Sequence, residues 1–269
     1  MVADELTKSC TSLTVEGVSL NIATMHRSGG RTPVVFLHGF GSTKEDYADC
    51  ACGSELDEHA FFAYDAPGCG ESDCSDLSRL SIPFLVASAT ALLDAQKINQ
   101  FHLVGHSMGG LTALLLARSL TGRVRSFVNI EGNLAPEDCF LSRQIVTHLS
   151  EGPHDFLDAF AERAWLSSTH GSKLFAASVR HKVRPEAVSG IFKSMVDISD
   201  GNDLLATFAT LSMPRLFVYG DENRSLSYLP YLQKSGIELC EIPNSGHWPM
   251  YSNPVALWGR VGAFLRLSH

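Results

Sequence analysis

The stretch "FHLVGHSMGGLTALLLARSL", residues 101–120, passes from an apolar run into a helix-like run through one serine flanked by glycines. The first five residues have the mostly apolar character of a buried parallel strand, and the residues from the serine onward have helical spacing. A turn this sharp leaves no room for a Cβ atom two residues before or after Ser107, which accounts for Gly105 and Gly109. We therefore interpret Ser107 as a strained, outward-facing nucleophile at a helix N-terminus, where free N–H groups favour negative charge.

The rest of the chain alternates strand-like and helix-like runs. Strands are expected at 13–25 (an opening hairpin), 33–39, 61–65, 101–105, 124–132, 215–220 and 237–243, and helices at 81–98, 107–120 and 254–267. Because these strands are almost wholly apolar and are separated by helices, we expect a mostly parallel sheet covered on both faces. The predicted fold class is α/β.

One long segment, residues 133–212, interrupts this alternation. It contains only helix-like runs, the first of them at 136–149, punctuated by glycine and proline. We interpret it as a helical cap inserted into a core formed by residues 1–132 and 213–269. Some of the aromatic side chains of the cap are expected to line an apolar pocket. These aromatic residues are Phe140, Phe156, Phe160, Trp165, Phe175 and Phe192.

Composition narrows the class of function. The chain has 269 residues, 45% of them hydrophobic, and its net charge of −8 argues against a nucleic-acid surface. No signal peptide and no run of 18 apolar residues are apparent, so no membrane span is expected. Seven irregularly spaced cysteines suit a reducing cytoplasm. No dinucleotide-binding or metal-binding motif is present, so neither a cofactor nor a metal is expected, and a homodimer is left open.

A serine nucleophile also requires a base and donors for an oxyanion. His247, in "NSGHWPM" (244–250), follows the last apolar strand and is the best-placed base. "HGFG" (38–41) follows an early strand, and its glycines allow the N–H of Phe40 to face the serine. That N–H and the N–H of Met108 are expected to form an oxyanion hole. Three neighbours of these groups are expected to contact the substrate: Gly39, His106 and Trp248.

A fourth motif, "DAPGCGES" (65–72), lies at the next strand end. The motifs "HGFG", "DAPGCGES", "GHSMGG" and "GHWP" occur in the order seen in α/β-hydrolase-fold serine hydrolases of the capped esterase or C–C hydrolase type. The chain resembles that family over nearly its whole length except the cap. The resemblance implies the α/β-hydrolase fold and a triad in the chain order serine, acid, histidine, acting on a small molecule.

The acid of that triad departs from the family pattern. In the families that this chain resembles, the acid usually follows the strand here written "RLFVYG", in a G-x-x-D pattern. This chain reads "GDEN" (220–223), so the uncharged Asn223 stands at the expected position. The carboxylate that orients the histidine must therefore come from elsewhere.

Two alternatives remain for the acid. Asp221 or Glu222 could serve if the loop differs by two residues. Glu131, which closes an earlier apolar strand, could serve instead. One subgroup of haloalkane dehalogenases is similar to the second arrangement, with a glutamate after the earlier strand and an asparagine at the later position. A carboxylate ending a buried strand needs a partner, and His247 would supply one. The sequence favours Glu131 and keeps Asp221 as the alternative.

The expected function is a two-step acyl transfer through Ser107 on a small to medium apolar ester, thioester or lactone. The first alternative is a C–C bond hydrolase of a diketone-type ring-cleavage product, which would use the same serine and histidine. The second is a non-hydrolytic ligand receptor on the same fold.

Overall fold

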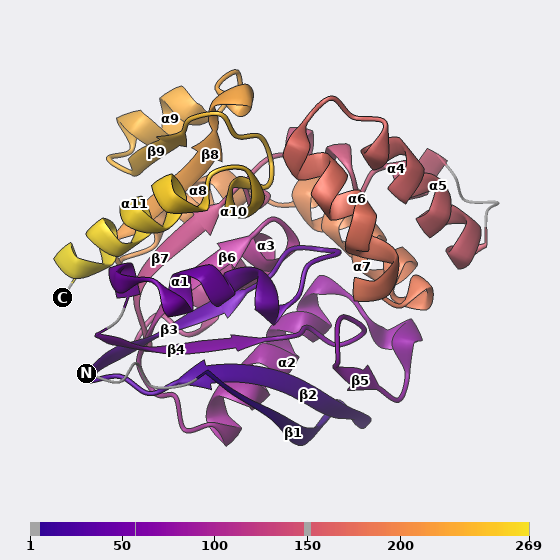
Figure 1. The fold of residues 1–269 in the computed structure, drawn as a ribbon, viewed down its shortest axis with the longest axis horizontal. Helices are drawn as coiled ribbons and strands as arrows, with labels where there is room; N and C mark the ends of the chain where they lie inside the picture. The colour runs from indigo at the N-terminus through magenta and orange to yellow at the C-terminus, as the bar shows by residue number, and fades with distance from the viewer. Residues whose placement is uncertain (1–5, 57, 148–151, 269) are drawn as a thin grey trace.

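The computed structural model describes residues 6–56, 58–147 and 152–268 (Figure 1), so the last two residues of the helix expected at 136–149 lie outside the described residues. The strands are β1 (Thr7–Val15), β2 (Val18–Arg27), β3 (Arg31–Leu37), β4 (His59–Tyr64), β5 (Asp73–Cys74), β6 (Phe101–His106), β7 (Val124–Ile130), β8 (Arg215–Gly220) and β9 (Glu238–Ile242). The helices are α1 (Ala48–Cys52), α2 (Ile82–Ala95), α3 (Met108–Ser119), α4 (Gln144–Thr147), α5 (Pro153–Trp165), α6 (His170–Lys182), α7 (Pro185–Gly201), α8 (Leu204–Thr210), α9 (Leu229–Lys234), α10 (Pro249–Ser252) and α11 (Pro254–Leu267).

The strands form one mostly parallel sheet, as expected. Its order is β1-β2-β4-β3-β6-β7-β8-β9, with β5 paired to β2. Pairings from β4 to β9 are parallel, and those of β2 with β1, β4 and β5 are antiparallel. After β3 the chain first adds β4 on one side and then crosses to add β6 on the other. This switch point opens a crevice at the carboxyl ends of β3 and β6, the place where open α/β sheets bind ligands.

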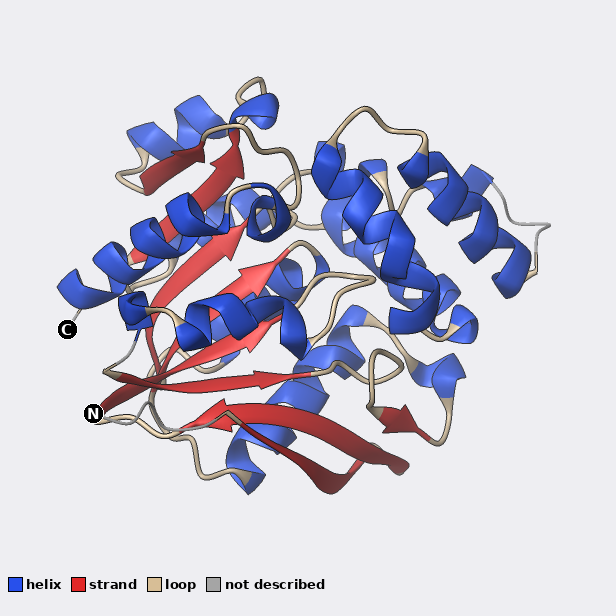
Figure 2. Ribbon diagram, in the orientation of Figure 1, coloured by secondary structure: helices blue, strands red, loops and turns tan. Residues whose placement is uncertain are grey.

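Helices cover both faces of the sheet (Figure 2). Helices α2 and α3 pack together on one face, while α1 and α11 pack together on the other. Side-chain caps mark where several helices begin: Ser81 accepts the N–H of Phe84 at the start of α2, and Asn253 accepts that of Ala256 at the start of α11. Prolines in the first turn fix the backbone at both starts.

Helices α4 to α7 form a separate group beyond the carboxyl ends of the strands (Figure 1). Helix α8, which falls within the expected cap, lies elsewhere. Its Phe208 makes edge-to-face contacts with Phe127 of β7 and Phe217 of β8. Arg215 also binds the carbonyl of Phe208. We therefore place the end of the proposed cap near Gly201 rather than at residue 212.

In the part of the chain that the structure describes, no helix combines the length and the apolar character that crossing a bilayer requires.

Candidate active site

Ser107 lies on the tight turn between β6 and α3. Its backbone has φ 52° and ψ −120°, a left-handed conformation that is costly for a residue with a side chain. A Cβ on Gly105 would lie 2.5 Å from the carbonyl oxygen of Gly109, and one on Gly109 would lie 2.2 Å from that of Leu37. The steric reason predicted for the two glycines is confirmed.

His247 connects Ser107 to a carboxylate. Its Nε2 lies 2.9 Å from the Ser107 hydroxyl, and its Nδ1 lies 2.8 Å from Oε2 of Glu131. A carboxylate only accepts, so Nδ1–H donates to Glu131 and Nε2 is left to accept the serine proton. The imidazole is 8% exposed, which shields both hydrogen bonds from water. The structure thus brings together the expected nucleophile, base and favoured acid.

Glu131 owes its position to a second strained turn, at the end of β7. Its φ is 47°, and its N–H donates to the carbonyl of Val218 in β8. Gly132 follows, and a Cβ there would lie 2.6 Å from the Cα of Gly110 in α3. The nucleophile and the acid therefore sit on two adjacent strand ends that pack backbone to backbone.

Asn223, the departure from the family pattern, holds the acid in place. Its Nδ2 donates to both oxygens of Glu131, at 2.9 and 2.8 Å, and the N–H of Gly220 donates to Oε1 at 2.7 Å. These donors compensate the burial of the carboxylate. An amide at the position usually held by the acid was the sequence signal for this role.

Asp221 has a different task. Its carboxylate accepts the N–H of Ser245 at 2.9 Å, and the N–H groups of Ser245 and Asn244 lower its pKa. It therefore anchors the loop that leads to His247, and the carboxylate bonded to the imidazole is that of Glu131. Glu222 lies beside the same loop, with Oε2 2.6 Å from where a Cβ on Gly246 would stand. Of the candidate acids, Glu131 is the one hydrogen-bonded to the histidine.

The proposed oxyanion loop passes directly over Ser107. A Cβ on Gly39 would lie 3.1 Å from the Cβ of Ser107, and the chain then turns through a Ser42 N–H to Gly39 carbonyl bond. Met108 is the first residue of α3, so its N–H has no intrahelical acceptor. These placements suit the expected pair of donors, the N–H groups of Phe40 and Met108.

The expectation that His106 contacts the substrate needs correction. Its ring is buried, and its Nε2–H donates to the main-chain carbonyl of His247 at 2.7 Å. Burial, followed by the neighbouring His247, lowers the pKa of His106 to about 3. His106 is thus a neutral side chain whose hydrogen bond positions the backbone of His247.

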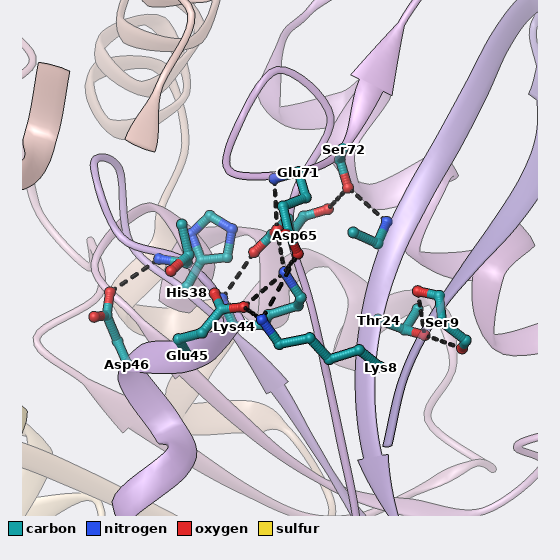
Figure 3. A network of polar contacts seen from close by, with 12 residues as sticks. Lys8, Ser9, Thr24, His38, Lys44, Glu45, Asp46, Asp65, Glu71 and Ser72 are labelled. Carbon is teal, nitrogen blue, oxygen red and sulfur yellow. Dashed lines mark hydrogen bonds and ion pairs between the residues drawn. The ribbon is translucent and has the colours of Figure 1, made fainter. Parts of the chain in front are cut away.

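A buried ion pair fastens the proposed oxyanion loop to the loop that follows β4 (Figure 3). The ammonium of Lys44 lies 2.7 Å from Oδ2 of Asp65, and both side chains are fully buried. The N–H of Lys44 also donates to Oδ1 of the same carboxylate. At the other end of the loop, Nε2 of His38 accepts the N–H of Ala66. In the sequence, the motif around Asp65 is the one feature that points to this clamp.

Two further carboxylates surround the ammonium, those of Glu71 at 2.6 Å and Glu45 at 2.9 Å. Burial alone would lower the pKa of Lys44, but its hydrogen bonds to the carboxylates outweigh that effect and raise it. Lys44 therefore stays charged, and Lys8 extends the network to the surface by pairing with Glu45.

Replacing Lys44 with methionine should therefore destabilise the fold and loosen the loop. Removing one partner of a buried pair costs about 3–5 kcal/mol, because the other charge is left buried alone. The melting temperature and kcat should both fall. Lys8→Met is the matched control, because Lys8 is 54% exposed and an exposed pair contributes about 0–1 kcal/mol. Equal effects of the two substitutions would contradict the clamp.

A small cavity adjoins the triad. Its volume is about 20 Å³. Phe140 contacts the His247 ring edge to face and is 53% exposed, so it forms an outer wall. Of the three expected substrate contacts, Trp248 lines this cavity. The full lining is Phe40, Ser107, Asp138, Phe140, Leu141, Ser142, Phe192, Met195, His247 and Trp248.

The aromatic residues of the cap divide by position. Phe140 and Phe192 line the cavity. Phe156 and Phe160 stack on each other, while Phe175 stacks on Trp248, and all three phenylalanines are buried. Trp165 is 52% exposed. Among the described residues, no cluster of three or more His, Cys, Asp or Glu side chains could hold a metal ion.

Comparison with known proteins assigns the family. The sequence profile of the Alpha/beta hydrolase family matches residues 34–259. The chain therefore belongs to that family, and the predicted fold is confirmed.

Individual relatives are distant. The chain is 24% identical to the Mycoplasma pneumoniae protein named "Putative esterase/lipase 2", over 86% of this chain and 88% of that protein. A thermophilic esterase from Thermogutta terrifontis superposes with a TM-score of 0.74 at 19% identity, over 98% and 99% of the two chains. The enol-lactonase of Burkholderia xenovorans LB400 superposes with a TM-score of 0.69 at 20% identity, over 95% and 100%. These two structures share the fold with this chain.

Proposed function

We propose that this protein is a serine hydrolase that cleaves small to medium apolar esters, thioesters or lactones through an acyl-enzyme on Ser107. The observation that carries the proposal is the continuous chain of hydrogen bonds from the Ser107 hydroxyl through His247 to Glu131. A serine hydroxyl is a weak nucleophile until a base takes its proton, and this arrangement supplies the base in the required tautomer. The names of the relatives, which include esterases and a lactonase, agree with it.

In the first step, Ser107 Oγ attacks the carbonyl carbon while Nε2 of His247 takes its proton. The carbonyl oxygen becomes negatively charged and is held by the N–H groups of Phe40 and Met108. Glu131 stabilises the imidazolium that forms. As the tetrahedral intermediate collapses, Nε2–H passes its proton to the leaving oxygen or sulfur, and the acyl group stays on Ser107.

In the second step, water attacks the acyl-enzyme. Nε2 of His247 takes a proton from that water, the same two N–H groups hold the new oxyanion, and Ser107 leaves with the proton from the imidazolium. The products are a carboxylic acid and free enzyme. Every proton moves through one nitrogen, which is why the tautomer of His247 matters.

The cavity wall favours a neutral substrate. Most of its side chains are apolar, and the described lining contains a carboxylate, Asp138, but no lysine or arginine. Burial raises the pKa of Asp138 to about 6, against three hydrogen-bond donors that favour its charged form. At neutral pH this group is mainly ionised and repels an anionic substrate.

The cap must move for an ester to enter. A cavity of about 20 Å³ holds one water molecule and no more. Two contacts join the cap to the core: Phe192 packs on Phe40 in the cavity wall with ring centroids 4.4 Å apart, and Lys182 pairs with Asp46 at 2.8 Å. Opening the cap would expose both the substrate site and the face of the proposed oxyanion loop on which Phe192 packs.

The pH profile should show one essential base. kcat/KM for an ester is expected to fall as the pH is lowered in a scan from about pH 8 to pH 5, since a base that already carries a proton cannot accept the one from the serine. The pKa of His106, near 3, keeps that neighbour neutral throughout the scan. Release of p-nitrophenol, read at its isosbestic wavelength, measures the rate. A flat profile would exclude His247 as the base.

A substrate panel tests the proposal against its two alternatives. Esters, thioesters, lactones and a diketone would be compared on unlabelled protein, and a separate sample would be tested for labelling of Ser107 by a fluorophosphonate. Turnover of the first three classes supports the proposal, and turnover of the diketone alone supports the C–C hydrolase. A folded protein that is neither labelled nor active would turn attention to the receptor, with ligand screening by thermal shift.

A further inference from the structure

One polar group in the wall of the active-site cavity has no partner. Ser142 lies in the proposed cap between Phe140 and α4, and 2% of its surface is exposed to solvent. Within the described residues its hydroxyl oxygen makes no hydrogen bond. A buried hydroxyl without a partner destabilises a fold, so such a group in a native protein calls for an explanation. Its place in the wall of the cavity suggests one.

The other polar side chains of that wall are already occupied. The Ser107 hydroxyl and both ring nitrogens of His247 belong to the proposed triad. Asp138 accepts the Tyr228 hydroxyl on Oδ1 and two main-chain N–H groups on Oδ2. Of the described polar side chains that line the cavity, Ser142 alone is therefore uncommitted.

We propose that the Ser142 hydroxyl binds a neutral oxygen on the part of the substrate that the cap covers. The preferred substrates are then neutral esters carrying an ether, hydroxyl or ketone oxygen away from the scissile bond, rather than plain hydrocarbon esters. This inference rests on the proposed function. A hydroxyl can donate to such an oxygen, while the apolar walls and Asp138 disfavour a charged group.

Pairs of esters that differ by one CH₂-to-oxygen replacement test the inference. p-Nitrophenyl butyrate and p-nitrophenyl methoxyacetate form the shortest pair, and the same replacement is moved along p-nitrophenyl hexanoate. A parallel pair of acetates, of butanol and 2-methoxyethanol, tests the alcohol side. For each pair the ratio of kcat/KM, oxygen over carbon, is compared between wild type and Ser142→Ala. Intrinsic reactivity cancels in that comparison.

The expected result is a fall of about tenfold in this ratio for at least one pair in Ser142→Ala, the size of one hydrogen bond to a neutral group. Ser178→Ala is the matched control. Ser178 is a half-buried serine of the same cap, its hydroxyl donates to main-chain carbonyls of α6, and it does not line the cavity. Its ratios should equal those of wild type.

Three other outcomes overturn the inference. Ratios unchanged in every pair, with turnover intact, would mean that Ser142 does not bind substrate oxygen. An equal loss of kcat for both members of each pair would assign Ser142 to the water of the second step. A lower melting temperature with unchanged ratios would make the hydroxyl structural. Fluorophosphonate labelling separates these results from failure of the proposed function, because an unlabelled wild type would contradict the hydrolase itself.

Discussion

Replacing Ser107 with alanine should abolish fluorophosphonate labelling and lower kcat by about 10⁶-fold. The hydroxyl is the group that would form the covalent bond, and it is the one the His247 nitrogen contacts, at 2.9 Å. A small residual rate is expected from binding and oxyanion donors alone. Intact mass spectrometry reports the adduct, and ester hydrolysis reports the rate.

The substitution should leave the fold intact, because it removes one oxygen atom from a turn. A melting temperature close to that of wild type would show this. The strained backbone at Ser107 has φ 52°, and alanine adopts that conformation no more easily than serine. A labelled Ser107→Ala protein would move the nucleophile to another residue.

Replacing Glu131 with glutamine should lower kcat by about 10⁴-fold, the size seen when a triad acid becomes an amide. The structure explains how. The N–H of Gly220 donates to Oε1 and would hold the amide oxygen there, which turns the amide NH₂ toward His247. Nδ1 must then accept a hydrogen bond, so the proton moves to Nε2, and Nε2 can no longer take the serine proton.

Asp221→Asn is the matched control for that substitution. Its amide oxygen can still accept the N–H of Ser245, so the loop before His247 keeps its anchor. Turnover should stay within a few-fold of wild type. If Asp221→Asn were the damaging change and Glu131→Gln the mild one, Asp221 would be the acid. Loss in both would mean that the anchoring role is as demanding as the catalytic one.

The sequence predicted most of the core because its signals there are local. Apolar strands separated by helices indicate a parallel sheet, and the carboxyl ends of such strands gather along one edge. Ser107 and His247 each follow a strand, so their meeting could be expected from the chain alone. The observed bounds of β8 match the expected strand at 215–220.

The sequence favours Glu131 as the acid but leaves Asp221 as an alternative, because the choice depends on side-chain direction. Glu131 and Asp221 both follow strands that end at the same edge, on neighbouring β7 and β8. Only the left-handed turn at Glu131 and the amide of Asn223 separate them. Similarly, His106 is adjacent to the nucleophile in sequence, but its ring lies against Gly39 and the main-chain carbonyl of His247 rather than in the cavity wall.

The set of residues that lines the cavity could not be predicted from the sequence either. Ser142 and Met195 come from different parts of the helical segment, and their meeting depends on how helices pack rather than on periodicity. The Lys44–Asp65 pair joins residues 21 positions apart, where the sequence showed only a lysine after a glycine-rich motif. The sequence indicates that some of the six aromatic residues of the cap line a pocket, but it does not show that Phe140 and Phe192 are the ones that do.

The position of Glu131 has a mechanical consequence. The first residues of the proposed cap follow it directly, so the proposed acid stands at the base of the segment that moves to admit an ester under the proposed function. Where the acid follows β8 instead, the moving part and the chemistry are separated along the chain. Here Gly220 and Asn223, at the end of β8 in the core, donate hydrogen bonds to the Glu131 carboxylate. These hydrogen bonds would keep the Glu131 carboxylate directed at His247 while the proposed cap moves.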